Sequence, residues 1–282
     1  MKEYIKKAKK NIVFAGGDLR QVYAAEILSR NPEFSVLTIG FLKENIPSSK
    51  VKCFSGNFND IDYIDILVLP HSVSEKENIL SSPYGNEYIP IKILFEKVKQ
   101  GGLVCCGKLP SSINQTDESK KFEFCNYFER EDFQIKNAVP TAEGAIQVAM
   151  KETSRTIWKS KVLVIGFGRI GKILSKRLRD MGADVTVSAR SFSDRAYVES
   201  VGYKAISTNV LEDYIGEFDI IFNTVPALLI TESVLDLVSE SSLIIDLASR
   251  PGGMDFSYAK NHGKRFVWAL SLPSERIYLH KL

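Results

Sequence analysis

The sequence has little excess charge of either sign and no long hydrophobic run. Its 282 residues include 37 lysines and arginines against 34 aspartates and glutamates, a formal net charge of +3 at pH 7. So small a charge, without a basic stripe, argues against a nucleic-acid partner. No apolar run approaches the ~20 residues that span a bilayer, and residues 1–7 lack the apolar segment of a signal peptide. We therefore expect a cytoplasmic protein without a membrane partner.

Cysteine is scarce as well, and the spacing of the four that are present does not suit a metal. Cys53, Cys105, Cys106 and Cys125 form no CxxC pair, and Cys105 and Cys106 adjoin inside an apolar segment. This pattern favours buried structural thiols in a reducing compartment. We expect no metal site.

Short apolar segments alternate with helical ones along the chain, which is typical of parallel sheets covered by helices on both faces. The length suggests two domains. We expect an α/β protein with two doubly wound parallel-sheet domains. Residues 1–140 would form a flavodoxin-like substrate domain, and residues 141–282 an NADP-binding Rossmann domain. A helix over about 141–153, with Thr141 as its candidate cap, would join them.

The apolar segments place the expected strands. In the first domain they are residues 11–15, 34–39, 51–54, 64–69 and 102–106, and in the second 162–165, 184–189, 203–206, 219–223, 242–246 and 264–268. The second set is enough for both mononucleotide-binding halves of a Rossmann fold. Residues 118–130 form an amphipathic segment that contains Phe122, Phe124 and Phe128. These side chains offer more apolar surface than a cleft between the two expected domains would cover. We therefore expect a homo-oligomer.

One stretch, residues 161–193, organises the second domain. It runs from a strand through a glycine-rich turn to an amphipathic helix and a second strand, the context that a GxGxxG motif needs. The turn reads Gly166-Phe167-Gly168-Arg169-Ile170-Gly171. Gly166 suits the tight turn, Gly168 lets the backbone approach a pyrophosphate, and Gly171 allows the helix and strand to pack closely. The helix start then favours a phosphate.

The end of the second strand distinguishes between the nicotinamide cofactors. An NAD site usually places Asp or Glu there for the ribose 2′-OH, whereas this chain has Ser188-Ala189-Arg190-Ser191, with Ser193 and Arg195 just beyond. Asp184 begins the strand, roughly 16 Å from the cofactor end at ~3.3 Å per residue. A guanidinium among hydroxyls suits a 2′-phosphate. We expect NADP, with Thr224, Val225 and Pro226 after a later strand also at the cofactor.

Five motifs over about residues 10–270 carry a family resemblance. They are AGGDLR (15–20), PTAEGAI (140–146), VIGFGRIG (164–171), SAR (188–190) and IDLASRPGGMDF (245–256). In these motifs the chain resembles the A subunits of dipicolinate synthase from spore-forming bacteria. The resemblance implies NADP-dependent oxidation of a dihydrodipicolinate-type intermediate to dipicolinate, beside a separate B subunit, in the sporulating mother cell. The tail from Ser274 departs from the family pattern.

A planar dicarboxylate substrate needs cations or N–H donors at the carboxyl ends of the strands. The candidates are Asp18, Arg20, Thr141, Ser249 and Arg250, with backbone N–H groups of the neighbouring glycines. Either arginine could instead form a structural ion pair. Glu143 or His71 could remove the proton, although Glu143 could simply stabilise the first turn of its helix.

Two other functions fit the same features. A 2-hydroxyacid dehydrogenase shares the two-domain plan and needs an Arg, a Glu and a His. Arg250 suits the first role, while Glu275 and His280 lie in the divergent tail. A non-catalytic NADP-binding regulatory subunit would share every glycine-rich feature.

Overall fold

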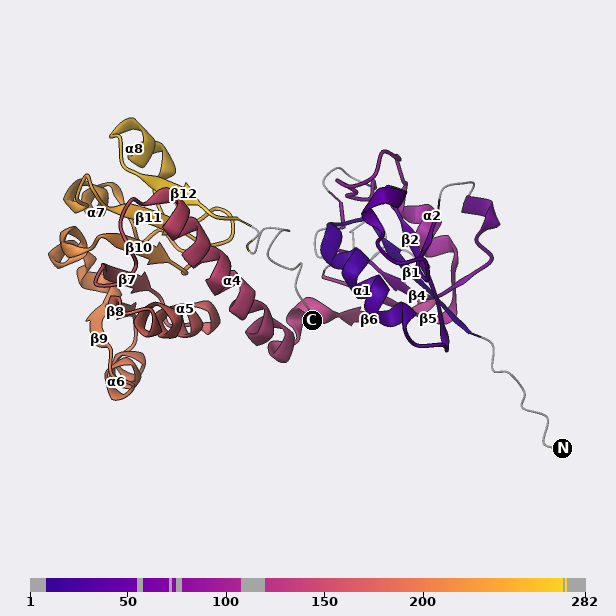
Figure 1. Ribbon diagram of the computed structural model, residues 1–282, viewed down its shortest axis with the longest axis horizontal. Coiled ribbons are helices and arrows are strands. Elements are labelled where there is room, and N and C mark those ends of the chain that lie inside the picture. The colour runs from indigo at the N-terminus through magenta and orange to yellow at the C-terminus, as the bar shows by residue number, and fades with distance from the viewer. Residues whose placement is uncertain are drawn as a thin grey trace. The chain divides into compact units, whose positions relative to one another are not determined.

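The computed structural model describes residues 9–54, 58–70, 73–74, 78–107, 120–270 and 272. His71, Ser274, Glu275 and His280 lie outside these residues. The chain divides into two compact units, Met1–Phe133 and Gln134–Leu282, each built on a six-stranded parallel sheet (Figure 1). The predicted α/β class with two doubly wound sheets is confirmed. No helix of the described residues is long and apolar enough to cross a membrane.

The first unit has a flavodoxin-like sheet with one additional edge strand. Its elements are β1 (Lys10–Ala15), α1 (Leu19–Ser29), β2 (Phe34–Ile39), β3 (Lys52–Cys53), β4 (Ile64–Val68), α2 (Ile91–Glu96), β5 (Val98–Cys106) and β6 (Phe122–Asn126). The strand order is β3-β2-β1-β4-β5-β6. Without the two-residue β3, this is the 2-1-3-4-5 order of flavodoxin-like folds.

Strand β6 is an edge strand that the sequence did not predict. Phe122 is buried and lies 5.5 Å from Phe95, ring centre to ring centre, whereas Phe124 is exposed. Phe128 packs against Tyr127 and Phe133 instead. The sequence predicted an amphipathic segment here, because apolar and polar residues alternate over only a few positions in this edge strand. Of the three phenylalanines expected at an oligomer surface, Phe124 alone is among the exposed side chains.

The second unit has the Rossmann strand order. Its elements are α4 (Glu131–Glu152), β7 (Lys161–Ile165), α5 (Arg169–Asp180), β8 (Asp184–Ala189), α6 (Phe192–Ser200), β9 (Lys204–Ser207), β10 (Ile220–Asn223), α7 (Glu232–Leu237), β11 (Leu243–Asp246), α8 (Phe256–Asn261) and β12 (Phe266–Trp268). The order β12-β11-β10-β7-β8-β9 places the topological switch point between β7 and β10. All six predicted strands are present.

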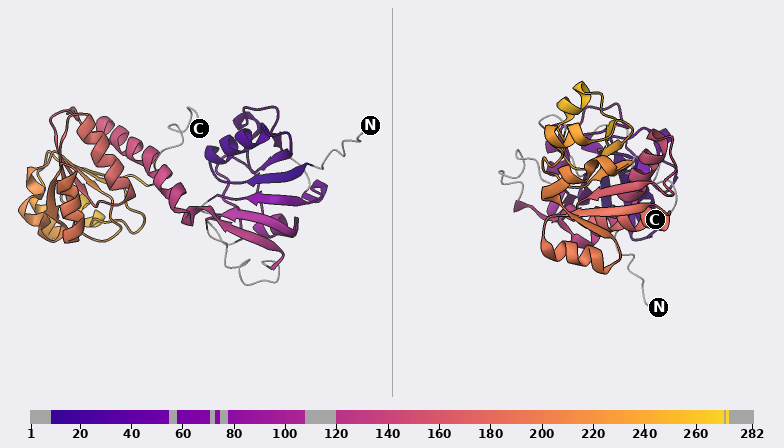
Figure 2. Two further views of the ribbon diagram at one scale, coloured as in Figure 1. Left: turned by 90° about the horizontal axis from the view of Figure 1, so that it is seen from below. Right: turned by 90° about the vertical axis from the view of Figure 1, so that its left-hand side faces the viewer.

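Two apolar layers cover the second sheet. On one face Ala142 and Ala145 of α4 and Leu174 of α5 pack against Val162 and Val164. On the other face Leu235 of α7 and Ala259 of α8 belong to the cluster around Leu163 and Ile165. The central strands β7, β10 and β11 are therefore buried on both sides, as their apolar sequences predict, whereas the edge strands β9 and β12 are partly exposed. Figure 1 and Figure 2 show α4 and α5 running along this sheet.

Helix α4 begins at Glu131 rather than near Thr141. Pro140 lies inside the helix, and Glu131 and Asp132 supply the acidic first turn that favours a helix start. Thr141 is therefore not a cap. Its hydroxyl is buried, 2.8 Å from Asn137 O and 3.2 Å from Leu272 O. The predicted start near Thr141 was wrong, because α4 continues through Pro140, a residue that is rare inside helices.

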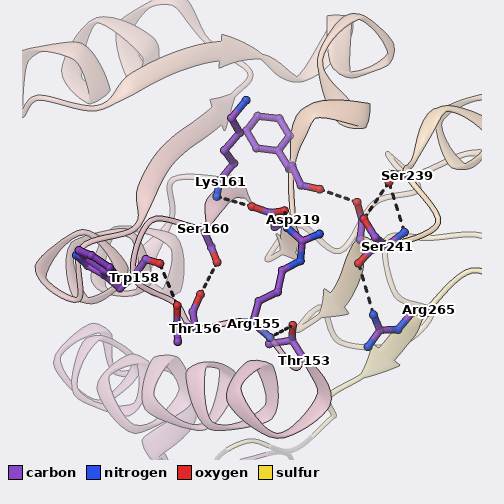
Figure 3. A network of polar contacts seen from close by, with 12 residues as sticks. Thr153, Arg155, Thr156, Trp158, Ser160, Lys161, Asp219, Ser239, Ser241 and Arg265 are labelled. Carbon is purple, nitrogen blue, oxygen red and sulfur yellow. Dashed lines mark hydrogen bonds and ion pairs between the residues drawn. The ribbon is translucent and has the colours of Figure 1, made fainter.

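A polar network holds the amino end of the second sheet (Figure 3). The Asp219 carboxylate accepts the backbone N–H of Lys161 at 2.9 Å and pairs with Arg155. Arg265 donates to Glu152 O, at the end of α4, at 2.7 Å. These contacts fix the starts of β7, β10 and β12, so the opposite, carboxyl edge is the one left for a ligand.

Candidate functional site

The glycine-rich turn lies between the ends of β8 and β10. The Gly166 N–H donates to Ser188 O at 2.8 Å, and the Thr224 N–H donates to Ile165 O at 2.9 Å. Thr224 Oγ1 adds a second bond to Ile165 O, also at 2.9 Å. The turn, the end of β8 and the loop after β10 therefore form one surface at the switch point.

The three glycines of the motif have different surroundings. Gly166 has φ +100°, and a Cβ there would lie 2.5 Å from Thr224 Oγ1. A Cβ on Gly171 would lie 2.1 Å from Gly166 O, whereas a Cβ on Gly168 would meet nothing within 4 Å. Gly166 and Gly171 are therefore required for packing, and the space beside Gly168 is open.

The start of α5 is suited to an anion. Gly168 precedes the helix and gives it no side-chain cap, and the first N–H groups of an α-helix have no partner within the helix. Arg169, exposed, and Ile170, half-buried, form the first turn. A pyrophosphate could accept these N–H groups and interact with the helix dipole.

The end of β8 carries a cation and no carboxylate of its own. Arg190 is exposed, while Ala189 and Ser188 are buried, and Ser188 Oγ has no hydrogen bond among the described residues. Asp184 lies at the opposite end of β8. Ser191 caps α6, because its Oγ accepts the Asp194 N–H at 3.0 Å and lies 2.6 Å from Asp194 Oδ2.

A buried amide–carboxylate pair fixes the loops after β10 and β11. Asp246 Oδ1 accepts Asn223 Nδ2 and the Ala248 N–H, each at 2.9 Å. Asp246 Oδ2 accepts the Gly253 N–H at 2.8 Å. Asn223 also bonds to both backbone groups of Val225, at 3.0 and 3.1 Å. Asn223 and Asp246 begin the two segments that the sequence places after strands at the candidate site, but the bond between their side chains was not predicted.

Arg250 lies on an aromatic platform beside this pair. Its guanidinium is 5.8 Å from the centre of the Trp268 ring, and the Trp268 indole N–H donates to Ala248 O at 3.1 Å. Phe256 stacks on Trp268, with ring centres 4.3 Å apart. Ser249 and Arg250 are both exposed. They are the predicted substrate ligands that the second unit presents at its carboxyl edge. Pro226, a predicted cofactor residue, lies in the loop after β10.

In the first unit the predicted substrate residues bind each other. Asp18 caps α1 by accepting the Arg20 N–H at 2.9 Å, and Arg20 Nε lies 2.9 Å from both Asp18 carboxylate oxygens. The nearby Tyr127 hydroxyl donates to Leu69 O at 3.0 Å, and burial raises the pKa of Tyr127 to about 12. Tyr127 follows β6 and belongs to the segment that the sequence predicts to be amphipathic.

The glycines expected to offer N–H groups to a substrate use them within the protein. Gly16 and Gly17 donate to Ile39 O and Ser81 O, at 2.9 and 2.7 Å. Gly252 donates to Ser249 O at 2.8 Å, and Gly253 donates to Asp246. The N–H groups of these four glycines therefore already have partners in the tight turns, and the approach of other backbone N–H groups to a substrate beside Gly17 and Gly252 stays a prediction.

Glu143 lies in α4 and pairs with α5. Its Oε1 is 2.9 Å from Arg177 Nη2, and Arg177 lies roughly 12 Å along α5 from Arg169 at 1.5 Å per residue. This ion pair gives Glu143 a structural role, and its role as a base stays a prediction. His71 lies outside the described residues. Among the described residues no group of three or more His, Cys, Asp or Glu could hold a metal ion.

Comparisons with known proteins cover both units. The family model for the N-terminal domain of the dipicolinate synthase A-subunit matches residues 11–128. The NAD binding domain of D-isomer specific 2-hydroxyacid dehydrogenases matches residues 130–250. The dipicolinate synthase A-subunit of Bacillus subtilis (strain 168) is 32% identical over 266 residues, which cover 93% of this chain and 88% of that protein.

Two solved structures extend the likeness to the fold. Dipicolinate synthase, A chain, from Bacillus subtilis has a TM-score of 0.82 and 30% identity over 94% of this chain and 89% of that one. The dipicolinate synthase A-subunit from Bacillus halodurans has a TM-score of 0.84 and 29% identity over 94% and 91%. The chain therefore belongs to the family of dipicolinate synthase A-subunits.

Proposed function

We propose that the chain is an NADP-dependent oxidoreductase subunit that oxidises a dihydrodipicolinate-type intermediate to dipicolinate. It would act with a B subunit, in the cytoplasm of the mother cell of a sporulating bacterium, and as a homo-oligomer. The family supports the dipicolinate reaction, and the NAD-binding match over residues 130–250 supports a nicotinamide cofactor. In this proposal the second unit binds NADP, and residues of both units bind the substrate.

The residues at the carboxyl end of β8 favour NADP over NAD. Its last residues, next to the Gly166 turn, are followed by exposed Arg190. The carboxylate nearest in sequence, Asp194, is bound to Ser191. A ribose 2′-OH would find no carboxylate from β8 itself, whereas a 2′-phosphate would find a guanidinium.

The residues present fit the reaction in outline. A nicotinamide cofactor held by the Gly166 turn and Arg190 would supply hydride transfer. Glu143 and His71 are the candidate bases for the second hydrogen, which would leave as a proton. Ser249 and Arg250 would bind one carboxylate of the substrate, while Asp18, Arg20 and Thr141 stay weaker candidates because each already has a partner.

Turnover by the isolated full-length chain tests this proposal. With dihydrodipicolinate as substrate, we expect kcat/KM for the reduction of NADP⁺ to exceed that for NAD⁺. The absorbance of the reduced nicotinamide measures both rates. Binding of NADP⁺ without any reduction, with and without the B subunit, would favour a regulatory subunit. Equal kcat/KM for NADP⁺ and NAD⁺ would contradict the cofactor assignment.

A 2-hydroxyacid dehydrogenase reaction is the second candidate, because the family model that covers residues 130–250 is named for that activity. A panel of 2-hydroxy acids in the same assay distinguishes the two reactions. Reduction of NADP⁺ by a 2-hydroxy acid, but not by dihydrodipicolinate, would support the second candidate.

A further inference from the structure

We infer that Arg195, and not Ser191, joins Arg190 in binding the 2′-phosphate of NADP. This inference rests on the proposed function, since it concerns the same cofactor site. It assigns a role to a side chain of α6 that lies beyond the strand end where an NADP site is usually sought.

The guanidinium of Arg195 is held at the end of β8. Its Nη1 donates to Arg190 O at 2.8 Å and to Ala189 O at 3.2 Å. Its carbon Cζ lies 4.4 Å from the centre of the Phe192 ring, which is a cation–π distance. Two carbonyls and a ring therefore orient the group beside the last residues of β8. Nε and Nη2 have no hydrogen bond to any described residue, so their N–H groups can bind a ligand.

Ser191 cannot serve the phosphate in the same way. Its Oγ accepts the Asp194 N–H at 3.0 Å and donates its single proton to Asp194 Oδ2 at 2.6 Å. These two bonds join the N-cap of α6 to its third residue; they resemble a capping box, except that the Asp194 carboxylate accepts the Ser191 hydroxyl and not its backbone N–H. The hydroxyl that the sequence assigned to the cofactor is thus used in the helix cap, and it keeps the Asp194 carboxylate bound.

Phosphate chemistry favours two guanidinium groups at this place. A 2′-phosphate carries close to two negative charges and accepts paired N–H groups from arginine. Exposed Arg190 supplies the first guanidinium and oriented Arg195 the second. Orientation matters because an arginine that is already held loses less conformational entropy on binding. Phe192, 87% exposed, provides the surface on which Arg195 is held.

Calorimetry with 2′,5′-ADP and 5′-AMP on the full-length chain tests the inference, because the two ligands differ by the 2′-phosphate. We expect Arg195→Gln to weaken 2′,5′-ADP binding about 10- to 100-fold, as for one charge-assisted hydrogen bond, and to leave 5′-AMP within about twofold. Arg195→Lys should recover part of the loss, because it keeps the charge. Ser191→Ala should keep the affinity for 2′,5′-ADP within about twofold.

Arg179 offers a matched control. Its guanidinium lies 4.3 Å from the Tyr203 ring centre and donates to Val201 O at 2.7 Å, so it makes the same kinds of contact away from β8. Arg179→Gln should change the affinity for neither ligand.

The results distinguish a failure of the NADP assignment from a failure of the role given to Arg195. A wild-type chain that binds 5′-AMP as tightly as 2′,5′-ADP would overturn the NADP assignment and this inference with it. A wild-type preference for 2′,5′-ADP that survives Arg195→Gln, or is lost in Ser191→Ala, would overturn the inference alone. Equal weakening of both ligands by Arg195→Gln would show a structural role only.

Discussion

A methyl group added at Gly171 should affect stability, whereas one added at Gly168 should affect cofactor binding. A Cβ on Gly171 would lie 2.1 Å from the main-chain oxygen of Gly166, which cannot move without shifting the turn. We expect Gly171→Ala to lower the free energy of unfolding by more than ~2 kcal/mol, as for other overpacked sites. Thermal unfolding of the variant measures this loss.

Gly168→Ala is the matched change at an open position. With nothing within 4 Å of the added methyl group, we expect an unchanged Tm within about 2 °C. The methyl group would face an approaching pyrophosphate, so NADPH affinity should fall about tenfold or more, measured by titration of its fluorescence. A Tm as low as that of Gly171→Ala would contradict this account.

At the scale of residues, the sequence predicted which positions need glycine better than it predicted which side chains bind each other. The GxGxxG spacing identified the tight turn and the close contact of Gly171, because both depend on the absence of a Cβ. It could not show that Arg20 pairs with Asp18 or that Ser191 caps a helix. Those roles depend on which polar atoms the folded chain brings within 3 Å.

At the scale of elements, the Asn223–Asp246 pair joins two loops of the candidate site. Asp246→Asn keeps the size of the side chain but turns one acceptor into a donor, which would face one of the three N–H donors now bound. We expect a loss of about 1.5–3 kcal/mol in the free energy of unfolding, as for a hydrogen bond to a charged group. Denaturant unfolding measures it.

Asp213→Asn is the control for this change, because Asp213 is exposed. It should alter stability by less than ~0.5 kcal/mol. An Asp246→Asn variant as stable as this control would show that the buried carboxylate does not hold the loops.

Element boundaries were the least predictable part of the fold. Apolar runs identified the central strands β7, β10 and β11 most directly, since these strands are buried on both faces. The sequence predicted a helix that begins near Thr141, whereas α4 begins at Glu131 and continues through Pro140. Strand β6 was missed because an edge strand has one exposed face and only five residues.

At the scale of the whole molecule, each unit has its own apolar core. The two clusters of the second unit draw their buried members from residues 142–269, and those of the first unit from residues 12–122. The sequence predicted two α/β domains because strands and helices alternate in both halves. Contacts divide the chain at Phe133 and Gln134, and the boundary predicted after residue 140 lies in the same helix.

The separate cores predict that the second unit folds alone when its first helix is complete. A fragment of residues 131–282 keeps all of α4 and both clusters, so we expect cooperative unfolding and an affinity for 2′,5′-ADP within about threefold of the full chain. A fragment that begins at residue 141 lacks Asn137, whose carbonyl accepts the buried Thr141 hydroxyl. We expect it to be less stable by about 1 kcal/mol or more. Calorimetric unfolding and titration of both fragments measure these differences. A 131–282 fragment that unfolds without cooperativity, or that binds no 2′,5′-ADP while the full chain does, would contradict an independent second core.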